Sequence, residues 1–242
     1  MGKYLIFGAT GGIGQAIAHD LAAHGCHLHL AGREAGALQA TAQSLQAGYS
    51  VFDAFDTASI EKAVHEASDD GALAGLVWAV GSILLKPLAQ LSEDDFLSCY
   101  HLNTAAPAMA VKAAVPALKA ASGSVLLFSS VAASQGFTAH AAIAAAKAGI
   151  EGLTRSLAAE FAPSIRVNAI APSLTETKMA APLTNNAVLA KGIAGAHPLP
   201  RLGQPDDFAG LARLLLLPET GSWITGSIFP VDGGRGALRT KG

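Results

Sequence analysis

Short apolar runs alternate with longer amphipathic segments along the whole chain. The apolar runs are almost continuous, which is typical of strands that are buried on both faces of a parallel sheet. They lie at Lys3–Phe7, His27–Ala31, Ser50–Asp53, Gly75–Ala79, Ser124–Ser129, Arg166–Ala171 and Ser227–Val231. Segments with helical spacing lie between them, among others at Thr57–Ser68, Pro107–Ala121, His140–Phe161 and Asp206–Leu217. This alternation predicts a doubly wound α/β fold, with a mainly parallel seven-stranded sheet and helices on both faces.

The chain contains no linker, repeat or low-complexity segment that would divide its 242 residues, so we expect one domain spanning residues 1–242. The longest irregular stretch, residues 172–205, contains five prolines and follows a predicted strand. Doubly wound sheets bind their ligands beyond the carboxyl ends of the strands. We therefore expect residues 172–205 to form a substrate lid loop.

Composition narrows the classes of function. Hydrophobic residues make up 51% of the chain and charged residues 14%, and the formal net charge is −2. Without a basic run, nucleic-acid binding has no electrostatic support. No stretch of about 18 apolar residues is present to span a bilayer. The start lacks the pattern of a signal peptide, and the isolated Cys26 and Cys99 do not make a disulfide framework. We expect a cytoplasmic protein with no nucleic-acid or membrane partner.

A glycine-rich turn between the first predicted strand and the following helix is the most informative motif. Its sequence is Gly8-Ala9-Thr10-Gly11-Gly12-Ile13-Gly14. Glycines let the backbone turn tightly and approach a pyrophosphate, and the helix start offers unpaired N–H groups and a positive dipole end. Glycine clusters also mark ordinary turns, but the strand–turn–helix context favours nucleotide binding.

Further motifs follow in order along the chain. They are Asp53 closing the third predicted strand, Asn103 in a helix, Ser129-Ser130 ending the fifth strand, Arg166-Val167-Asn168-Ala169-Ile170-Ala171-Pro172, Trp223-Ile224-Thr225-Gly226 and Val231-Asp232-Gly233-Gly234. With the Gly-x-x-x-Gly-x-Gly spacing of Gly8, Gly12 and Gly14, they make the chain resemble the short-chain dehydrogenase/reductase family over essentially its whole length. The resemblance implies a Rossmann-type fold and a nicotinamide dinucleotide cofactor.

The resemblance also assigns cofactor binding to a set of residues. The set comprises Gly8, Thr10, Gly11, Gly12, Ile13, Gly14, Arg33, Asp53, Ala79, Gly81, Lys147, Pro172, Ser173 and Thr177. An acidic side chain at the end of the second strand would bind the ribose hydroxyls of NAD and repel a 2′-phosphate. That position is Gly32, followed by Arg33, whose guanidinium can pair with a phosphate in two hydrogen bonds. Unless it is simply an exposed residue at a loop start, Arg33 predicts NADP(H), with Glu34 offsetting part of its charge.

The catalytic motif of the family is incomplete in this chain. Family members carry Tyr-x-x-x-Lys on one helix, where the lysine binds the ribose and lowers the pKa of the tyrosine, so that the phenol exchanges a proton with the substrate. The lysine is Lys147, but the tyrosine position is Ile143, and the interval back to Ser130 shows that the alignment is not shifted. The resemblance leaves Ser130, Lys147 and Asn103 as catalytic residues, without the principal acid–base group.

Three other departures from the family surround the cofactor. Phe7 stands where the family usually has threonine, Trp78-Ala79-Val80-Gly81 replaces Asn-Asn-Ala-Gly, and Ser173 replaces the glycine after Pro172. The first two departures exchange hydrogen-bonding side chains for apolar ones, which can fill the same sites without leaving unpaired polar atoms. They predict that the sheet is repacked beneath the cofactor.

His140 is the candidate replacement acid, because it lies three residues before Ile143, one helical turn away. The ordinary pKa of a histidine side chain, about 6.5, suits proton transfer at neutral pH. The alternative is a solvated or packed histidine at a helix start. His24, His27 and His29 are closely spaced, but no thiolate or carboxylate completes a ligand set, so we expect no metal.

Three functions remain open. The first is an NADP(H)-dependent oxidoreductase acting on a carbonyl, an alcohol or an activated double bond with an altered proton relay, which the retained catalytic residues favour. The second is a catalytically silent NADP(H)-binding sensor or partner subunit, and the third is a lyase or isomerase on the same fold. A medium-sized apolar substrate is predicted by Ile83, Leu84, Leu85, Met179, Ala180, Ala181 and Leu183. The small residues of His140–Phe161, with the resemblance, predict a homodimer or homotetramer.

Overall fold

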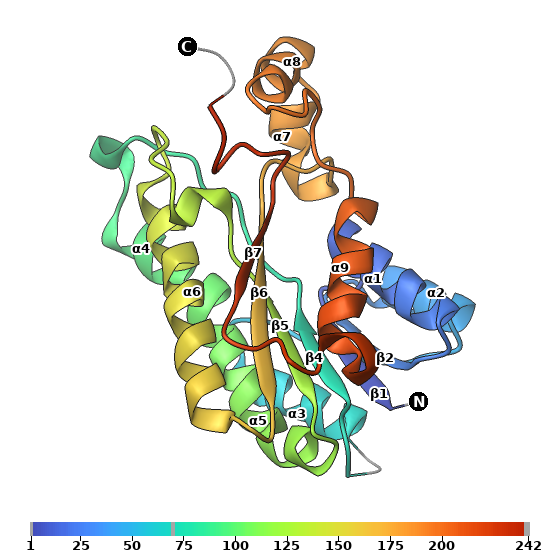
Figure 1. Cartoon of the computed structure of the whole chain (residues 1–242). Coiled ribbons are helices and arrows are strands. Elements are labelled where there is room, and N and C mark those ends of the chain that lie inside the picture. The colour runs from blue at the N-terminus through green and yellow to red at the C-terminus, as the bar shows by residue number, and fades with distance from the viewer. Residues whose placement is uncertain (1, 69–70, 240–242) are drawn as a thin grey trace.

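A seven-stranded parallel sheet forms the middle layer of the structure, a computed structural model that describes residues 2–68 and 71–239 (Figure 1). Its strands are β1 (Lys3–Phe7), β2 (His27–Gly32), β3 (Gly48–Val51), β4 (Gly75–Trp78), β5 (Ser124–Phe128), β6 (Arg166–Pro172) and β7 (Ile228–Val231). They lie in the order β3-β2-β1-β4-β5-β6-β7. The chain therefore starts in the middle, winds out to β3 and returns to β4, which leaves a crevice at the carboxyl ends of β1 and β4. The predicted doubly wound α/β fold is confirmed.

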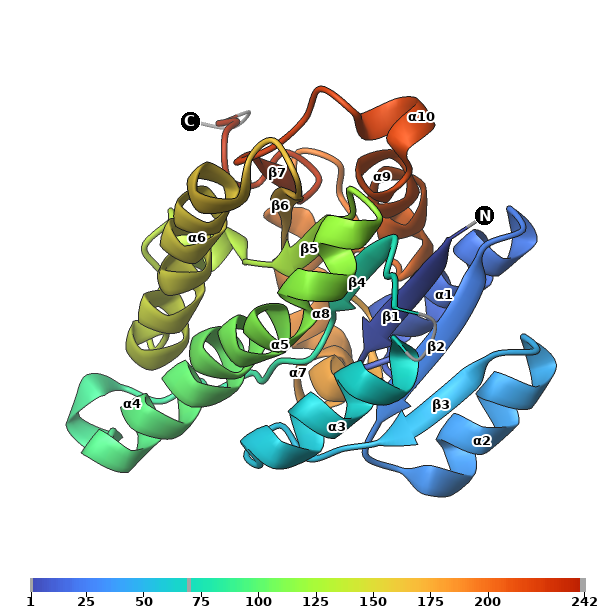
Figure 2. The ribbon, with the colours of Figure 1, turned by 90° about the horizontal axis from the view of Figure 1, so that it is seen from below.

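Helices cover both faces of this sheet (Figure 2). One face carries α1 (Gly12–Ala23), α2 (Ala35–Ser44) and α9 (Asp206–Leu216), followed by the short α10 (Pro218–Gly221). The other face carries α3 (Thr57–Ala67), α5 (Ala106–Ala120) and α6 (Ala141–Phe161). The helix α4 (Glu93–Tyr100) continues through a π-helical turn (His101–Ala105) into α5 and packs on α6.

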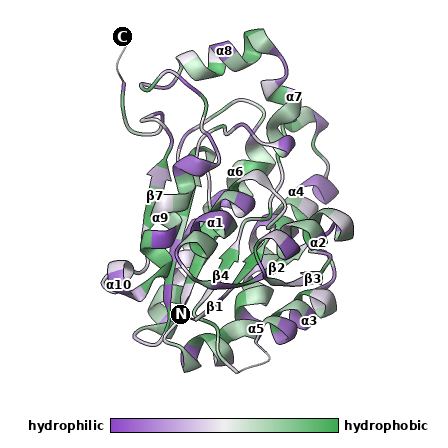
Figure 3. Ribbon diagram, turned by 90° about the vertical axis from the view of Figure 1, so that its right-hand side faces the viewer, coloured by the Kyte–Doolittle hydropathy of each residue, from purple (hydrophilic) through white to green (hydrophobic). Residues whose placement is uncertain are grey.

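The strands alternate between two apolar cores. Along β5, Val125 and Leu127 face the core beneath α3, α5 and α6, whereas Leu126 and Phe128 face the core beneath α1 and α9. Because both faces are covered, the central strands β1, β4 and β5 are buried at nearly every position, which is why their sequences are continuous apolar runs. Figure 3 shows β2 and β4 in green between helices of mixed colour.

Two sequence expectations about the elements differ from the structure. The third strand ends at Val51 and not at Asp53, because the carboxylate of Asp53 accepts a hydrogen bond from the backbone N–H of Phe55 and turns the chain away from β2. Residues 172–205 are not a plain loop. They contain α7 (Ala181–Thr184) and α8 (Ala187–Gly195), because the side chain of Asn186 caps the start of α8. Residues 1, 69–70 and 240–242 of the expected domain lie outside the described residues.

The two tryptophans occupy opposite environments. Trp78 ends β4 and is 2% exposed, whereas Trp223, in the segment between α10 and β7, is 99% exposed. Within the described residues, no helix combines the length and the apolar character needed to cross a membrane.

Candidate functional site

The glycine turn packs backbone against backbone. Gly8 has a φ of +82°, and a Cβ atom there would lie 2.8 Å from the carbonyl oxygen of Ala79. A Cβ atom on Gly14 would overlap the carbonyl oxygen of Gly8. The turn leads into α1, whose N-cap residue Gly11 offers no capping side chain. The first N–H groups of α1 therefore remain available to an anion, which is the environment that a pyrophosphate requires.

A cavity of about 520 Å³ lies between this turn and the segment that follows β6. Its lining residues are Thr10, Gly12, Gln15, Glu176, Thr177, Lys178, Ala181, Thr184 and Asn185. A Cβ atom on Gly12 would come within 2.9 Å of Cγ2 of Thr177, so the two segments touch across the floor of the cavity. The structure thus brings together Thr10, Gly12 and Thr177, three of the predicted cofactor residues.

Arg33 and Asp53 lie at the outer end of the same crevice. Gly32 of β2 pairs with Val51 of β3, so the residues that follow them emerge side by side. Both Arg33 and Asp53 are exposed. The backbone N–H of Asp53 donates to Oγ of Ser59 at 2.9 Å, which fixes the loop. Their contact with a cofactor stays a prediction.

Lys147 and Asn103 form the buried part of the catalytic side. Nζ of Lys147 donates to the carbonyl oxygen of Phe128 at 2.8 Å, and burial lowers the pKa of this lysine to about 8. Nδ2 of Asn103 donates to the carbonyl oxygen of Cys99 at 2.9 Å, while its Oδ1 has no hydrogen-bond partner among the described residues. A Cβ atom on Gly81 would lie 3.0 Å from that Oδ1 and 3.5 Å from Nζ of Lys147. Both polar groups therefore border the same small space beside Gly81.

Ser130 follows the end of β5 in an extended conformation. Its Oγ accepts a hydrogen bond from the backbone N–H of Ala132 at 3.1 Å. The neighbouring Ser129 donates to the carbonyl oxygen of Lys147 at 3.2 Å and to Oε1 of Glu151 at 3.0 Å. Ser129 thereby fixes the end of β5 to α6 and holds Ser130 at the same end of the sheet as Lys147.

The position expected to carry a tyrosine is packed with apolar groups. Ile143 is 6% exposed and belongs to a buried cluster with Cys99, Ala142 and Ala146. The partly buried side chains that pack on this cluster are Leu84, Leu85, Leu91 and Phe96. Burial raises the pKa of the Cys99 thiol, which keeps the thiol neutral. This part of the site is apolar, and the side chain of Ile143 can neither donate nor accept a proton.

His140 precedes the first turn of α6 as its N-cap residue. Its Nδ1 donates to the carbonyl oxygen of Thr138 at 2.7 Å, and its ring lies 5.3 Å from that of Phe137. The hydrogen bond holds the imidazole against its own turn. These contacts agree with the packed alternative, and the role of His140 as an acid stays a prediction.

Comparisons with known proteins identify the family. A family model described as enoyl-(acyl carrier protein) reductase matches residues 8–235. The chain belongs to the short-chain dehydrogenase/reductase family. Carbonyl reductase family member 4 of Danio rerio is 35% identical over 236 residues, which cover 95% of this chain and 96% of the relative. A tropinone reductase homolog of Arabidopsis thaliana is 33% identical over 239 residues, which cover 95% of this chain and 90% of the relative.

A solved structure agrees with this membership. A variant of actinorhodin polyketide ketoreductase, crystallised with NADPH, superposes with a TM-score of 0.92 and covers 98% of both chains at 26% identity. The relatives and this neighbour are named as reductases, and the neighbour holds NADPH. The family resemblance stated from the sequence is confirmed.

Within this short-chain dehydrogenase/reductase, two departures from the family pattern are in contact. The ring of Phe7 lies 4.9 Å from that of Trp78 and 4.8 Å from that of Phe52, and all three are buried. This aromatic cluster packs on the face of the sheet that carries α3 and α5, so the predicted repacking is present, but the expectation that it leaves no unpaired polar atom is wrong. The one unpaired atom is Nε1 of Trp78, which has no hydrogen-bond partner in the described part of the chain.

His197 is the polar residue that sequence reasoning missed. It follows α8, is 5% exposed, and accepts a hydrogen bond from Ser173 at its Nε2 over 2.8 Å. Its Nδ1 donates to the carbonyl oxygen of Ile193 at 2.8 Å. No local sequence motif marks this pair, because Ser173 and His197 are 24 residues apart. They come into contact because the chain folds back through α7 and α8. The departure at Ser173 was the one signal available.

Proposed function

We propose that the protein is an NADP(H)-dependent oxidoreductase that transfers hydride to or from a carbonyl, an alcohol or an activated double bond. The observation that carries the proposal is the glycine turn, in which Gly8 and Gly14 leave no room for side chains and α1 opens on a cavity of about 520 Å³. The relatives named as carbonyl reductase and tropinone reductase homolog support the reaction class. The ketoreductase crystallised with NADPH supports the cofactor.

The residues present fit a dinucleotide laid across the carboxyl ends of the strands. The turn at Gly11–Gly14, with Thr10, would bind the pyrophosphate. Lys147 would bind the nicotinamide ribose, and Thr177 would meet the carboxamide. Arg33 would pair with a 2′-phosphate, while the other predicted contacts are Asp53, Ala79, Gly81, Pro172 and Ser173. When bound, the nicotinamide supplies or accepts a hydride.

The chain's own groups would orient the substrate and handle its proton. Oγ of Ser130 can donate to a carbonyl oxygen, and Asn103 and Lys147 border a buried space that would accommodate a bridging water. The apolar cluster around Ile143 favours a medium-sized apolar substrate, and residues 172–205 would cover it as a lid. We expect one domain in a cytoplasmic homodimer or homotetramer. The exposed Leu97 and Tyr100 of α4 are candidates for that interface.

One observation favours a second candidate function. Ile143 is well packed, so the structure needs no tyrosine for its stability and shows no gap where one is missing. The protein would then bind NADP(H) as a sensor or partner subunit without turnover.

The test is a calorimetric titration with NADPH and NADH. We expect NADPH to bind at least about 10-fold more tightly, because hydrogen bonds between charged groups contribute about 1.5–3 kcal/mol. Arg33→Ala should remove the preference and leave NADH binding unchanged, and Arg155→Ala, at an exposed position on α6, is the matched control. If neither nucleotide binds, the oxidoreductase and the sensor are both excluded.

A further inference from the structure

A second cavity, of about 330 Å³, lies beside the end of β6 and contains the Ser173–His197 pair. Its other lining residues are Leu199, Arg201, Gly203, Asp207, Pro230, Val231, Asp232, Gly233 and Gly234. None of the groups assigned to the cofactor phosphates borders it. A buried imidazole that opens on a cavity through a serine hydroxyl therefore needs an explanation of its own.

The hydrogen bonds of His197 fix its tautomer and its orientation. Because a carbonyl oxygen only accepts, Nδ1 carries a proton and donates a hydrogen bond to the carbonyl oxygen of Ile193 at 2.8 Å. In the neutral ring Nε2 then holds a lone pair, and the hydroxyl of Ser173 donates to it at 2.8 Å. A Cβ atom on Gly233 would lie 3.4 Å from Cδ2 of His197, so backbone closes the side of the ring. An imidazole held in this way is positioned for proton transfer through the hydroxyl.

The register of the sheet places Ser173 on the catalytic side. The backbone N–H of Ser129 donates to the carbonyl oxygen of Ile170 at 2.8 Å, so Ser130 lies beside Pro172 on the neighbouring strand. Along β6, Ala169 faces the α6 core and Ile170 the α9 core. The alternation applies as far as Pro172, the last residue of β6, and Ser173 follows it at the carboxyl end of the sheet, where Ser130 also lies. His197 comes directly after α8, which lies beyond the carboxyl ends of the strands (Figure 1).

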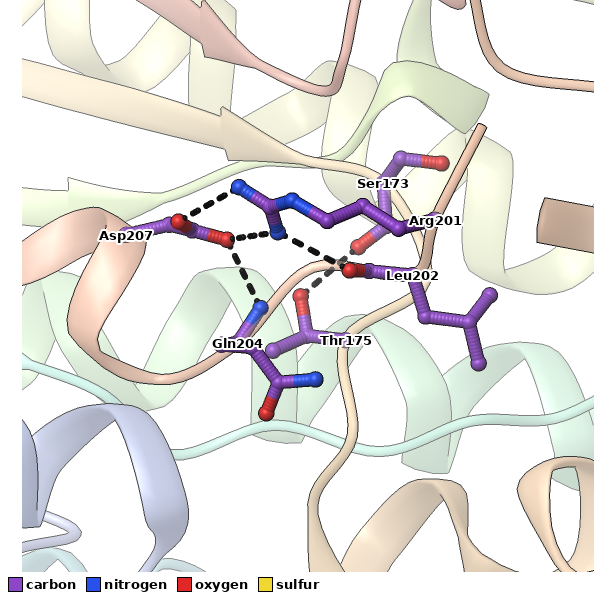
Figure 4. A network of polar contacts seen from close by, with 6 residues as sticks. All are labelled: Ser173, Thr175, Arg201, Leu202, Gln204 and Asp207. Atoms are coloured by element: carbon purple, nitrogen blue, oxygen red, sulfur yellow. Dashed lines mark hydrogen bonds and ion pairs between the residues drawn. The ribbon is translucent and has the colours of Figure 1, made fainter. Parts of the chain in front are cut away.

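The charged groups that border the cavity are already engaged. Arg201 pairs with both carboxylate oxygens of Asp207, at 2.6 and 2.8 Å, and Asp207 also accepts from the backbone of Gln204 (Figure 4). Asp232 accepts from the backbone N–H groups of Gly234 and Gly236, at 2.8 and 2.7 Å. The charged groups of the cavity thus have partners of their own.

We propose that Ser173 and His197 transfer the proton that a tyrosine at position 143 would have transferred. The inference rests on the proposed oxidoreductase function. In reduction, Ser173 would give its hydroxyl proton to the substrate oxygen, and a bound nicotinamide dinucleotide would supply the hydride for the substrate carbon. Ser173 regains a proton from Nε2 of the imidazolium of His197. His197 is left neutral, with its Nδ1–H still donating a hydrogen bond to the carbonyl oxygen of Ile193, and water returns a proton to Nε2. Oxidation runs through the same steps in reverse.

The first test follows the imidazole nitrogens of His197 by ¹⁵N NMR on the full chain between pH 5 and 9. We expect Nδ1 protonated and Nε2 unprotonated at high pH, and protonation of Nε2 within this range. Ser173→Gly should shift the Nε2 signal, because the hydroxyl donor is lost. A His197 that keeps one protonation state throughout, or that does not respond to Ser173→Gly, overturns the proposal whether or not a substrate is known.

The second test compares variants in the NADPH-dependent reduction of a panel of apolar ketones and diketones. His197→Gln should lower kcat about 100-fold or more at unchanged affinity for NADPH, since a positioned acid contributes about 10²–10⁴-fold. Ser173→Gly should act in the same direction, and Ser173→Thr should restore activity and the pH profile. His65→Gln, at an exposed position on α3, is the matched control.

The outcomes separate the two proposals. A wild-type protein that does not bind NADPH contradicts the proposed function itself. A wild-type protein that binds NADPH and turns over, with His197→Gln at full kcat, contradicts only the relay. If His140→Gln then loses the activity, the acid is His140.

Discussion

The glycine turn and the first turn of α6 lie at the same edge of the sheet, but they are packed in different ways. At the glycine turn, Gly8 meets the backbone of Ala79, and Gly14 meets the backbone of Gly8. At the start of α6, Ile143 meets side chains such as Cys99 and Leu84. Side chains in contact can be exchanged for others of similar volume. Backbone atoms in contact cannot move apart to make room for an added carbon without distorting the turn. By this difference, a substitution is tolerated more easily at Ile143 than at Gly8 or Gly14.

Of the substitutions that test this contrast, Gly14→Ala should have the largest effect, and the quantity it changes is the affinity for NADPH. The added carbon would overlap the carbonyl oxygen of Gly8 and force the turn open, so we expect NADPH affinity to fall about 100-fold, or about 2.7 kcal/mol. Gly36→Ala is the matched control, because nothing lies within 4 Å of its Cβ position in α2. Calorimetry on both variants measures the effect. Full affinity in Gly14→Ala would show that the turn tolerates side chains after all.

Lys147 allows a test of the buried catalytic side through stability. Burial lowers its folded-state pKa to about 8, below the value near 10.4 of an unfolded chain, so the unfolded chain binds the proton more tightly between these values. The free energy of unfolding should therefore rise as the pH increases from about 8 to about 10.5, by as much as about 3 kcal/mol. Lys147→Met should remove that rise in urea titrations at each pH. If the free energy of unfolding rises equally in the variant, groups other than Lys147 cause the rise.

Ile143→Tyr should have the smallest and most informative effect. A phenol at this position would add a general acid next to Lys147, and such a group contributes about 10²–10⁴-fold. We expect a gain below this range, because the larger ring must enter a packed cluster at a cost of about 1–3 kcal/mol. Ile143→Phe has the same bulk without the hydroxyl. Equal values of kcat in the two variants would mean that position 143 no longer faces the reacting atoms.

Features that depend on local sequence could be predicted, and features that depend on contacts between distant segments could not. The strands were predictable to within a few residues, because strands buried on both faces are continuous apolar runs. The glycine turn was predictable because its glycines stand between a strand and a helix. Contacts between distant residues were not predictable. The pair Ser173–His197 and the bond from Lys147 to Phe128 depend on how separate segments meet. The helix α8 was missed because alanine and glycine leave little amphipathic pattern.

The placement of the two tryptophans has a practical consequence. Trp78 is enclosed with Phe7 and Phe52 next to the strand end that supports the glycine turn, whereas the indole of Trp223 lies in solvent. A water-soluble collisional quencher such as iodide reaches only the second indole, so it removes the surface emission and leaves the core emission. The protein thus carries an internal optical probe beneath the cradle, which can be read without a label.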